Sequence, residues 1–192
     1  DDLDPPEDGL EPPEDDLEPP EGGGQLYFSF GTDGDDDFSA INISDAAPGD
    51  SSILFTGGGN DLINTVGSPF TNTVYAGSGD DILIGGNNDR FFGQAGNDQF
   101  FMTDEGNNIL YGGAGNDIFN LATAELPTGV NTIGDFTQGE DQIGVNGLEI
   151  GFDDLTLTQS GSDTIVSLSG QDFASLLQVE AESLNPDDFF FA

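Results

Sequence analysis

Short apolar runs alternate with polar turns along most of this chain. Between residues 25 and 120 the turns are rich in Gly, Asp and Asn, and no segment shows the i, i+3, i+4 spacing of a helix. Residues 121–192 instead alternate apolar and polar side chains, as in LTLT (155–158) and TIVSL (164–168). Both patterns favour β-strands joined by tight turns, so the chain is predicted to be all-β.

A nonapeptide of the form G-G-x-G-x-D-x-U-x, with U apolar, recurs through residues 31–120. The five best copies are GTDGDDDFS (31–39), TGGGNDLIN (56–64), AGSGDDILI (76–84), GQAGNDQFF (93–101) and GGAGNDIFN (112–120). The last three residues of each copy are predicted to form a short strand with its middle side chain in the core. These core positions are Phe38, Ile63, Leu83, Phe100 and Phe119.

The residue types of this repeat suit a Ca²⁺ ion. Glycine tolerates positive φ, so the first half of each unit can turn tightly and direct carbonyl oxygens inward. The sixth-position aspartate adds an anionic oxygen, and Ca²⁺ takes six to eight oxygen ligands. The expected ligands are the carboxylates of Asp36, Asp61, Asp81, Asp98 and Asp117 and the carbonyls of Gly57, Gly59, Gly77, Gly79, Gly96, Gly113 and Gly115.

At these residues the sequence resembles the RTX, or hemolysin-type calcium-binding, repeat family. The resemblance implies a parallel β-roll, a right-handed β-solenoid in which two nonapeptides make one coil, closed by a C-terminal β cap. It also implies about four to six bound Ca²⁺ ions. Secondary ligand candidates are Asp33, Asp89, Asn108, Asp135 and Asp141.

Degenerate units lie between the strong ones. APGDSSILF (47–55), GSPFTNTVY (67–75), GGNNDRFF (85–92) and TDEGNNILY (103–111) keep the apolar position but lose the aspartate, and Ser52, Asn72, Arg90 and Asn108 occupy its column. Strong and weak units alternate, allowing insertions at 40–46, 65–66 and 102. Because alternate units stack on one edge of a β-roll, the five aspartates are predicted to line one edge and leave the other poor in metal. Phe91, Phe101 and Tyr111 are predicted to flank the core positions.

The charge of the chain makes a cation necessary. It has 38 acidic residues, one base (Arg90) and a formal net charge of −37. Two carboxylates on coils about 5 Å apart repel by roughly 3 kcal/mol at an effective dielectric of 20. Folding and Ca²⁺ binding are therefore expected to be one equilibrium. The same charge argues against nucleic-acid and anionic-membrane partners.

Several chemistries are excluded by what the sequence lacks. Cysteine and histidine are both absent, which removes disulfides, thiolate nucleophiles and His-based acid–base catalysis. No run approaches 18 apolar residues, so no transmembrane helix is expected. We therefore expect no enzyme within this chain. A metal-free solenoid and an ice-binding solenoid remain alternatives, although threonine is too scattered for regular ice-binding ranks.

Three zones divide the chain. Residues 1–24 are an acidic Pro-rich linker, disordered or polyproline II, built on DDLDPPE, DGLEPPE and DDLEPPE. Residues 25–120 are the calcium-binding β-roll, and residues 121–192 are the β cap. Because the chain opens with Asp1 rather than Met, we expect a processed form or a fragment whose upstream domain is missing.

The segments NTIGDFTQGEDQIGV (131–145), GFDDLTLTQSGSDTIVSLSG (151–170) and FASLLQVEAESLNPDDFFFA (173–192) also resemble the region that follows RTX repeats. That resemblance implies an uncleaved export signal, read by a type I secretion machine, with the ending DDFFFA (187–192). The expected function is an extracellular Ca²⁺-binding module of a larger secreted or surface protein. The alternatives are an adhesive module and the C-terminal domain of a secreted hydrolase.

Overall fold

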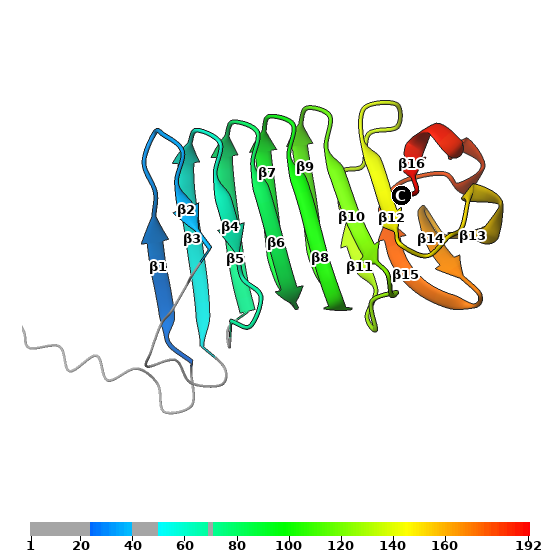
Figure 1. Cartoon of the computed structure of the whole chain (residues 1–192), viewed down its shortest axis with the longest axis horizontal. Helices are drawn as coiled ribbons and strands as arrows, with labels where there is room; N and C mark the ends of the chain where they lie inside the picture. Colours follow the sequence, from blue (N-terminus) through cyan, green and yellow to red (C-terminus); the bar gives the residue numbers. More distant parts are fainter. Residues whose placement is uncertain (1–23, 40–49, 69–70) are drawn as a thin grey trace, which may run out of the picture.

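The computed structural model describes residues 24–39, 50–68 and 71–192, and within them the fold is almost entirely β (Figure 1). The helical turns of this part are three short 3₁₀ segments, η1 (Phe152–Asp154), η2 (Ala181–Ser183) and η3 (Pro186–Asp188). None of its helices is long and apolar enough to cross a membrane. The all-β prediction is confirmed.

Two sheets face each other along the length of the molecule. The first, sheet A, has the strand order β1-β3-β5-β7-β9-β11-β15-β14-β13, and the second, sheet B, has the order β16-β12-β10-β8-β6-β4-β2. The strands of sheet A are β1 (Leu26–Phe30), β3 (Ser51–Gly58), β5 (Thr71–Ser78), β7 (Arg90–Ala95), β9 (Ile109–Ala114), β11 (Asn131–Ile133), β13 (Leu155–Ser160), β14 (Asp163–Leu168) and β15 (Gln171–Leu176). Those of sheet B are β2 (Asp37–Phe38), β4 (Leu62–Asn64), β6 (Ile82–Asn87), β8 (Gln99–Gly106), β10 (Ile118–Thr123), β12 (Gln142–Asn146) and β16 (Phe189–Phe190).

Consecutive strands of the roll alternate between the sheets, and each pairs in parallel with the strand two places along the chain. Leu62 pairs with Ile82 and Ile82 with Gln99 in sheet B, while Phe55 pairs with Tyr75 in sheet A. The strong repeats therefore supply sheet B and the degenerate repeats supply sheet A. This is the predicted parallel β-roll of two nonapeptides per coil.

Apolar side chains from both sheets fill the interior. Ile63, Leu83, Phe100 and Phe119 are fully buried, whereas Phe38, at the open end of sheet B, is half-buried. From sheet A, the fully buried side chains that face them in the roll include Leu54, Val74, Phe91 and Leu110. The prediction that Phe91 flanks the core was wrong. Phe91 pairs with Val74 and Leu110 in sheet A and points into the roll with them. Because this repeat is one residue short, the aromatic side chain on the outer face of sheet A is that of Phe92.

Five aromatic rings form a row on the outer face of sheet A, one from each of β1, β3, β5, β7 and β9. We call Phe30, Phe55, Tyr75, Phe92 and Tyr111 the aromatic row. Neighbouring ring centroids lie 4.8–5.6 Å apart with nearly parallel planes. Because the rings face one another, those inside the row present their edges to solvent and offer no open face for stacking a sugar.

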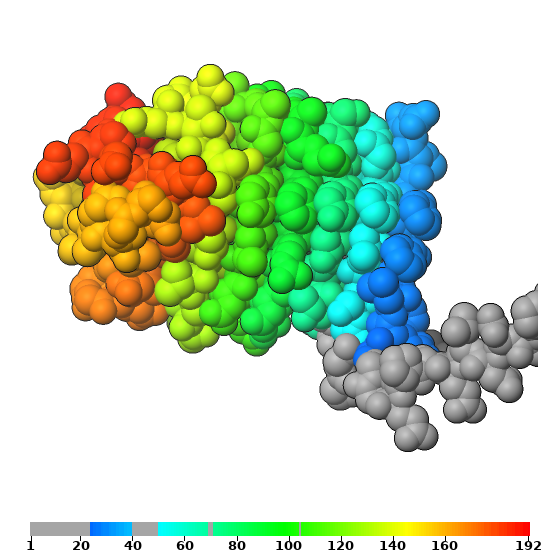
Figure 2. Space-filling model, turned by 180° about the vertical axis from the view of Figure 1, so that it is seen from behind, coloured from blue at the N-terminus to red at the C-terminus, as the bar shows by residue number. Residues whose placement is uncertain are grey.

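The C-terminal residues close one end of the roll (Figures 1 and 2). The coil continues past residue 120, since β11 and β12 extend the two sheets in parallel with β9 and β10. β15 then pairs with β11, the β13–β14 hairpin covers the end of sheet A, and β16 lies beside β12 in sheet B. The strands predicted at 155–158 and 164–168 are confirmed as β13 and β14.

Candidate metal edge

Six aspartates form one column where the chain passes from sheet A to sheet B. The amide N–H of each aspartate donates to Oδ1 of the aspartate in the next coil, over 2.7–3.0 Å. We call this column the aspartate edge, and its members are Asp36, Asp61, Asp81, Asp98, Asp117 and Asp141. The five sixth-position aspartates thus share one edge, as their spacing predicts, and Asp141 extends the column into the cap.

The second carboxylate oxygen of the inner aspartates has no partner. Oδ2 of Asp61, Asp81, Asp98 and Asp117 is buried without a hydrogen bond. At the two ends of the column, by contrast, Oδ2 accepts a backbone N–H, from Thr32 to Asp36 and from Thr137 to Asp141 (2.8 Å). A buried anionic oxygen without a donor is costly. The inner column therefore has the right chemistry for a cation.

Burial raises the pKa of these carboxyl groups. The pKa of Asp98 rises to about 7, first through desolvation and then through repulsion from Asp81 and Asp117. Desolvation also raises the pKa of Asp81 and of Asp117 to about 6. The column stores electrostatic strain that protons or a metal ion can relieve.

Glycines of the turns direct carbonyl oxygens from one coil toward the next. A Cβ placed on Gly79 (φ +127°) would lie 1.9 Å from the carbonyl oxygen of Gly59, and one on Gly96 (φ +140°) would lie 1.8 Å from that of Gly79. Gly77 and Gly115 meet the carbonyls of Gly57 and Gly96 in the same way. A side chain would both strain the backbone and fill the gap between coils. All seven predicted glycines have positive φ: Gly57, Gly59, Gly77, Gly79, Gly96, Gly113 and Gly115.

A second polar column runs beside the aspartates and was not foreseen. The fifth-position residues are linked coil to coil, because each backbone N–H donates to the side-chain Oδ1 of the preceding coil over 2.7–2.9 Å. Its members are Asp35, Asn60, Asp80, Asn97 and Asn116. The sequence does contain a signal for this column, since every strong unit has Asp or Asn at its fifth position, which the repeat template leaves free.

Two secondary candidates lie on the same side as the aspartate edge. Asp135 accepts the N–H groups of Gly112 (2.9 Å) and Gly113 (2.9 Å), which ties the cap to the last strong turn. Asp33 is exposed in the first turn, beside Gly58 of the next coil. Burial raises the pKa of Asp135 and that of Asp141.

The other two secondary candidates, Asp89 and Asn108, lie on the opposite edge. There the backbone N–H of Asn72 donates to Asp89 (2.8 Å), that of Asp89 to Asn108 (2.9 Å), and that of Asn108 to Asn131 (3.1 Å). The prediction that Arg90 occupies the sixth-position column was wrong. Arg90 pairs with Thr73, so Asp89 is the residue that lies next to Asn72 in this column. Amide side chains, which carry no charge, make up most of this opposite edge.

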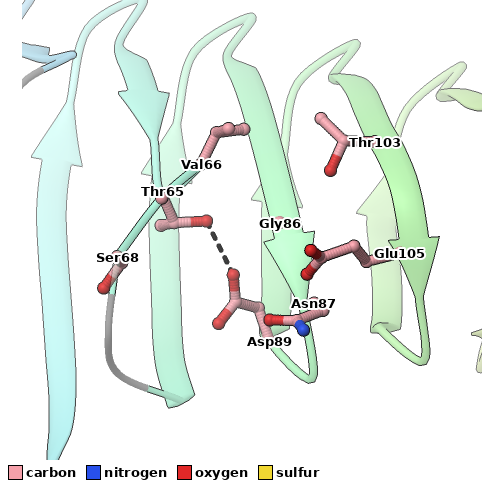
Figure 3. A pocket seen from close by; sticks show the side chains of 9 residues that line it. Thr65, Val66, Ser68, Gly86, Asn87, Asp89, Thr103 and Glu105 are labelled. Atoms are coloured by element: carbon pink, nitrogen blue, oxygen red, sulfur yellow. Dashed lines mark hydrogen bonds between the residues drawn. The ribbon is translucent and has the colours of Figure 1, made fainter.

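A cavity of about 440 Å³ opens on that opposite edge, where the sequence places insertions (Figure 3). Thr65, Ser68, Asp89, Thr103 and Glu105 are among its lining residues. Thr65 donates to Oδ2 of Asp89 (2.7 Å) and so holds this buried carboxylate in place. The cavity is separate from the aspartate edge.

The aspartate edge suits a cation only if the backbone takes part. Among the residues that the structure describes, no three His, Cys, Asp or Glu side chains converge on one point. Each gap between inner coils offers an unpaired carboxylate oxygen, and glycine carbonyls of one coil face the glycines of the next. Ca²⁺ accepts such mixed oxygen sets, whereas Zn²⁺ prefers nitrogen and sulfur.

Comparison with known proteins adds a family to this geometry. The profile of the family "Peptidase M10 serralysin C terminal" matches residues 56–189, and no curated protein matches the chain. Among solved structures, the AlgE6R3 subunit of the Azotobacter vinelandii mannuronan C5-epimerase is 22% identical (TM-score 0.39; 90% of this chain and 82% of that one covered). The AlgE6R2 subunit of the same enzyme is 20% identical (TM-score 0.38; 88% and 92% covered). The extracellular lipase LipA of Serratia marcescens is 15% identical (TM-score 0.36; 88% and 40% covered). The family profile spans more than half of the residues of this chain. The chain therefore belongs to the serralysin C-terminal family of RTX-type repeat domains.

Proposed function

We propose that this chain is a Ca²⁺-binding module whose folding is coupled to calcium outside the cell, after export through a type I secretion machine. The observation that carries the proposal is the row of buried, unpaired Oδ2 atoms at Asp61, Asp81, Asp98 and Asp117. Ions between these coils would be held by the aspartate carboxylates together with turn carbonyls such as those of Gly59 and Gly79. Extracellular calcium modules bind at about 10⁻⁴–10⁻³ M, which suits a switch between the cytoplasm and the exterior.

Electrostatics supplies the coupling. Without cations, the inner aspartates of the roll are desolvated and repel one another, whereas in an extended chain they are hydrated and further apart. Ca²⁺ that binds the folded state alone shifts the equilibrium toward folding by mass action. The cap assists, since Asp141 completes the column through its hydrogen bond to the N–H of Asp117 (3.0 Å).

The family supports a C-terminal place in a larger secreted protein. Its name describes the C-terminal part of a peptidase, and we propose that this module follows a hydrolytic domain of that kind. The described residues offer no comparable argument for catalysis, because their buried carboxylates belong to turns. An adhesive role has no specific observation in its favour.

Circular dichroism with added Ca²⁺ and then with excess EGTA tests the calcium switch. We expect a β spectrum in calcium, its loss in EGTA, and recovery when calcium returns. A β spectrum that survives complete chelation at neutral pH would overturn the proposal. Export is tested separately, by whether a type I exporter secretes the chain and whether loss of residues 187–192 stops it.

A further inference from the structure

We infer that β1 is a strand-pairing surface through which two copies of this chain associate end to end. β1 lies at the margin of sheet A and pairs with β3 on one side only. At the other end of the roll the cap covers both sheets (Figure 1). The inference is independent of calcium coupling, although the contact needs the folded roll.

The backbone of β1 is oriented for such pairing. The carbonyl of Gln25 accepts the N–H of Ser51 (2.8 Å), and the N–H of Gly31 donates to Phe55 (2.7 Å), so both residues direct their peptide groups toward β3. Because peptide groups alternate along a strand, those of Leu26, Phe28 and Phe30 point away from β3. No described strand pairs with that side.

The side chains of the same three residues favour a protein partner. Leu26 is 51% exposed, Phe28 55% and Phe30 71%, which makes Phe30 the most exposed large apolar side chain of the described residues. The strand LYFSF carries no charge and no proline. Natural edge strands are usually blunted by charge, proline or a bulge, because an apolar edge pairs with other chains. β1 has none of these protections.

A second copy fits this edge with a two-fold axis perpendicular to the sheets. β1 would pair antiparallel with its counterpart, with Phe28 opposite Phe28 at the axis and Leu26 opposite Phe30. This rotation reverses the strand direction, so the aspartate edges of the two copies lie on opposite sides of the dimer. The two rows of carboxylates therefore stay apart, and the uncharged strands meet at the centre.

Size and charge set the strength of this contact. One strand edge and three apolar side chains per copy form an interface smaller than the roughly 800 Å² per partner of a standard complex, so the dimer is weak. Each copy also has a formal net charge of −37. Long-range repulsion is screened by salt, so association should strengthen as NaCl rises, the reverse of an ion-paired interface.

Sedimentation of the calcium-loaded full chain, up to near-millimolar concentration and at two salt levels, tests the dimer. We expect a monomer–dimer equilibrium that Phe28→Glu weakens at least tenfold, because like charges would face each other at the axis. Thr73→Glu is the matched control, since Thr73 lies outward on β5, in the same row as Phe28, but away from the edge. A monomer at every concentration overturns the inference. So does a dimer that Phe28→Glu leaves intact, or one that only Thr73→Glu disrupts.

Cross-linking provides a second readout if Phe28→Glu fails to fold. The chain has no cysteine, so Phe28→Cys introduces a single thiol. Hydrogen-bonded antiparallel partners have Cα atoms about 5.5 Å apart, within the range of a disulfide. Mild oxidation should give a covalent dimer of Phe28→Cys but not of Thr73→Cys, and equal cross-linking of both would contradict the contact.

Discussion

Asp98 combines a structural and an electrostatic role in one carboxyl group. Its Oδ1 accepts the N–H of Asp81 (2.8 Å), while its Oδ2 is buried without a partner. Asp98→Asn keeps the first contact but replaces an anionic oxygen by a neutral group. We expect the calcium concentration at the folding midpoint to rise about tenfold or more, equivalent to about 1.4 kcal/mol per factor of ten.

Calcium titration followed by circular dichroism measures this shift, and Asp80→Asn is its control. Asp80 belongs to the fifth-position column, where the side-chain amide oxygens of Asn60 and Asn97 already accept the same kind of backbone hydrogen bond. The control should therefore move the midpoint little. Equal shifts in the two variants would mean that total charge matters, rather than the buried column.

Glycine is required at position 79 for two separate reasons. Its φ of +127° disfavours other residues, and an added Cβ would lie 1.9 Å from the carbonyl oxygen of Gly59. Gly161, at φ +68°, has nothing within 4 Å of an added Cβ. We expect Gly161→Ala to cost about 1 kcal/mol of strain and Gly79→Ala to cost more than about 3 kcal/mol in calcium. Urea unfolding of both variants measures the difference, and similar values would refute a steric role.

At the scale of the aspartate column, acid should partly replace calcium. Burial raises the pKa of Asp81 and Asp117 to about 6 and that of Asp98 to about 7 in the folded roll. The folded state thus binds more protons than the unfolded chain between about pH 4 and pH 7, so the stability of the calcium-free roll decreases as pH rises through this window. Circular dichroism in calcium-free buffer should show more β structure at about pH 5.5 than at pH 8. A spectrum that is the same at both pH values would contradict the raised pKa values of these buried carboxyl groups.

The repeat made the coils and the aspartate column predictable, because a fixed period determines which residues stack. Arg90 and Phe91 were misplaced because one deleted residue in GGNNDRFF changes the register locally, and only pairing with β5 and β9 settles it. The aromatic row escaped prediction for a different reason. All of its members except Phe30 lie one residue after a core position in a degenerate unit, and only the stacked strands bring Tyr75 and Phe92 to 4.8 Å.

The final strand, β16, lies in the segment that we propose to carry the export signal, and it also serves the fold. Phe189 is 4% exposed and lies 5.3 Å from Phe152, centroid to centroid, while Oδ2 of Asp188 accepts the N–H of Asn185 (2.9 Å). Phe189→Ala should lower the free energy of unfolding by about 3 kcal/mol. Phe30→Ala, at a 71% exposed side chain, should cost under about 1 kcal/mol. Chemical denaturation in calcium compares them, and equal losses would show that β16 adds little to the cap.

For the whole molecule, general screening of charge and specific ion binding predict different responses to salt. A formal net charge of −37 expands a chain by self-repulsion, and any salt reduces that repulsion. The inner aspartates are buried in the roll, where bulk ions screen poorly and their unpaired oxygens need a ligand. NaCl at the same ionic strength as the calcium buffer should therefore contract the chain without folding it. Small-angle scattering with circular dichroism separates these states, since an unfolded chain of this length has a radius of gyration of roughly 47 Å. Folding in NaCl alone would show that screening suffices, and the aspartate edge would then be a consequence of the fold rather than the reason that it needs calcium.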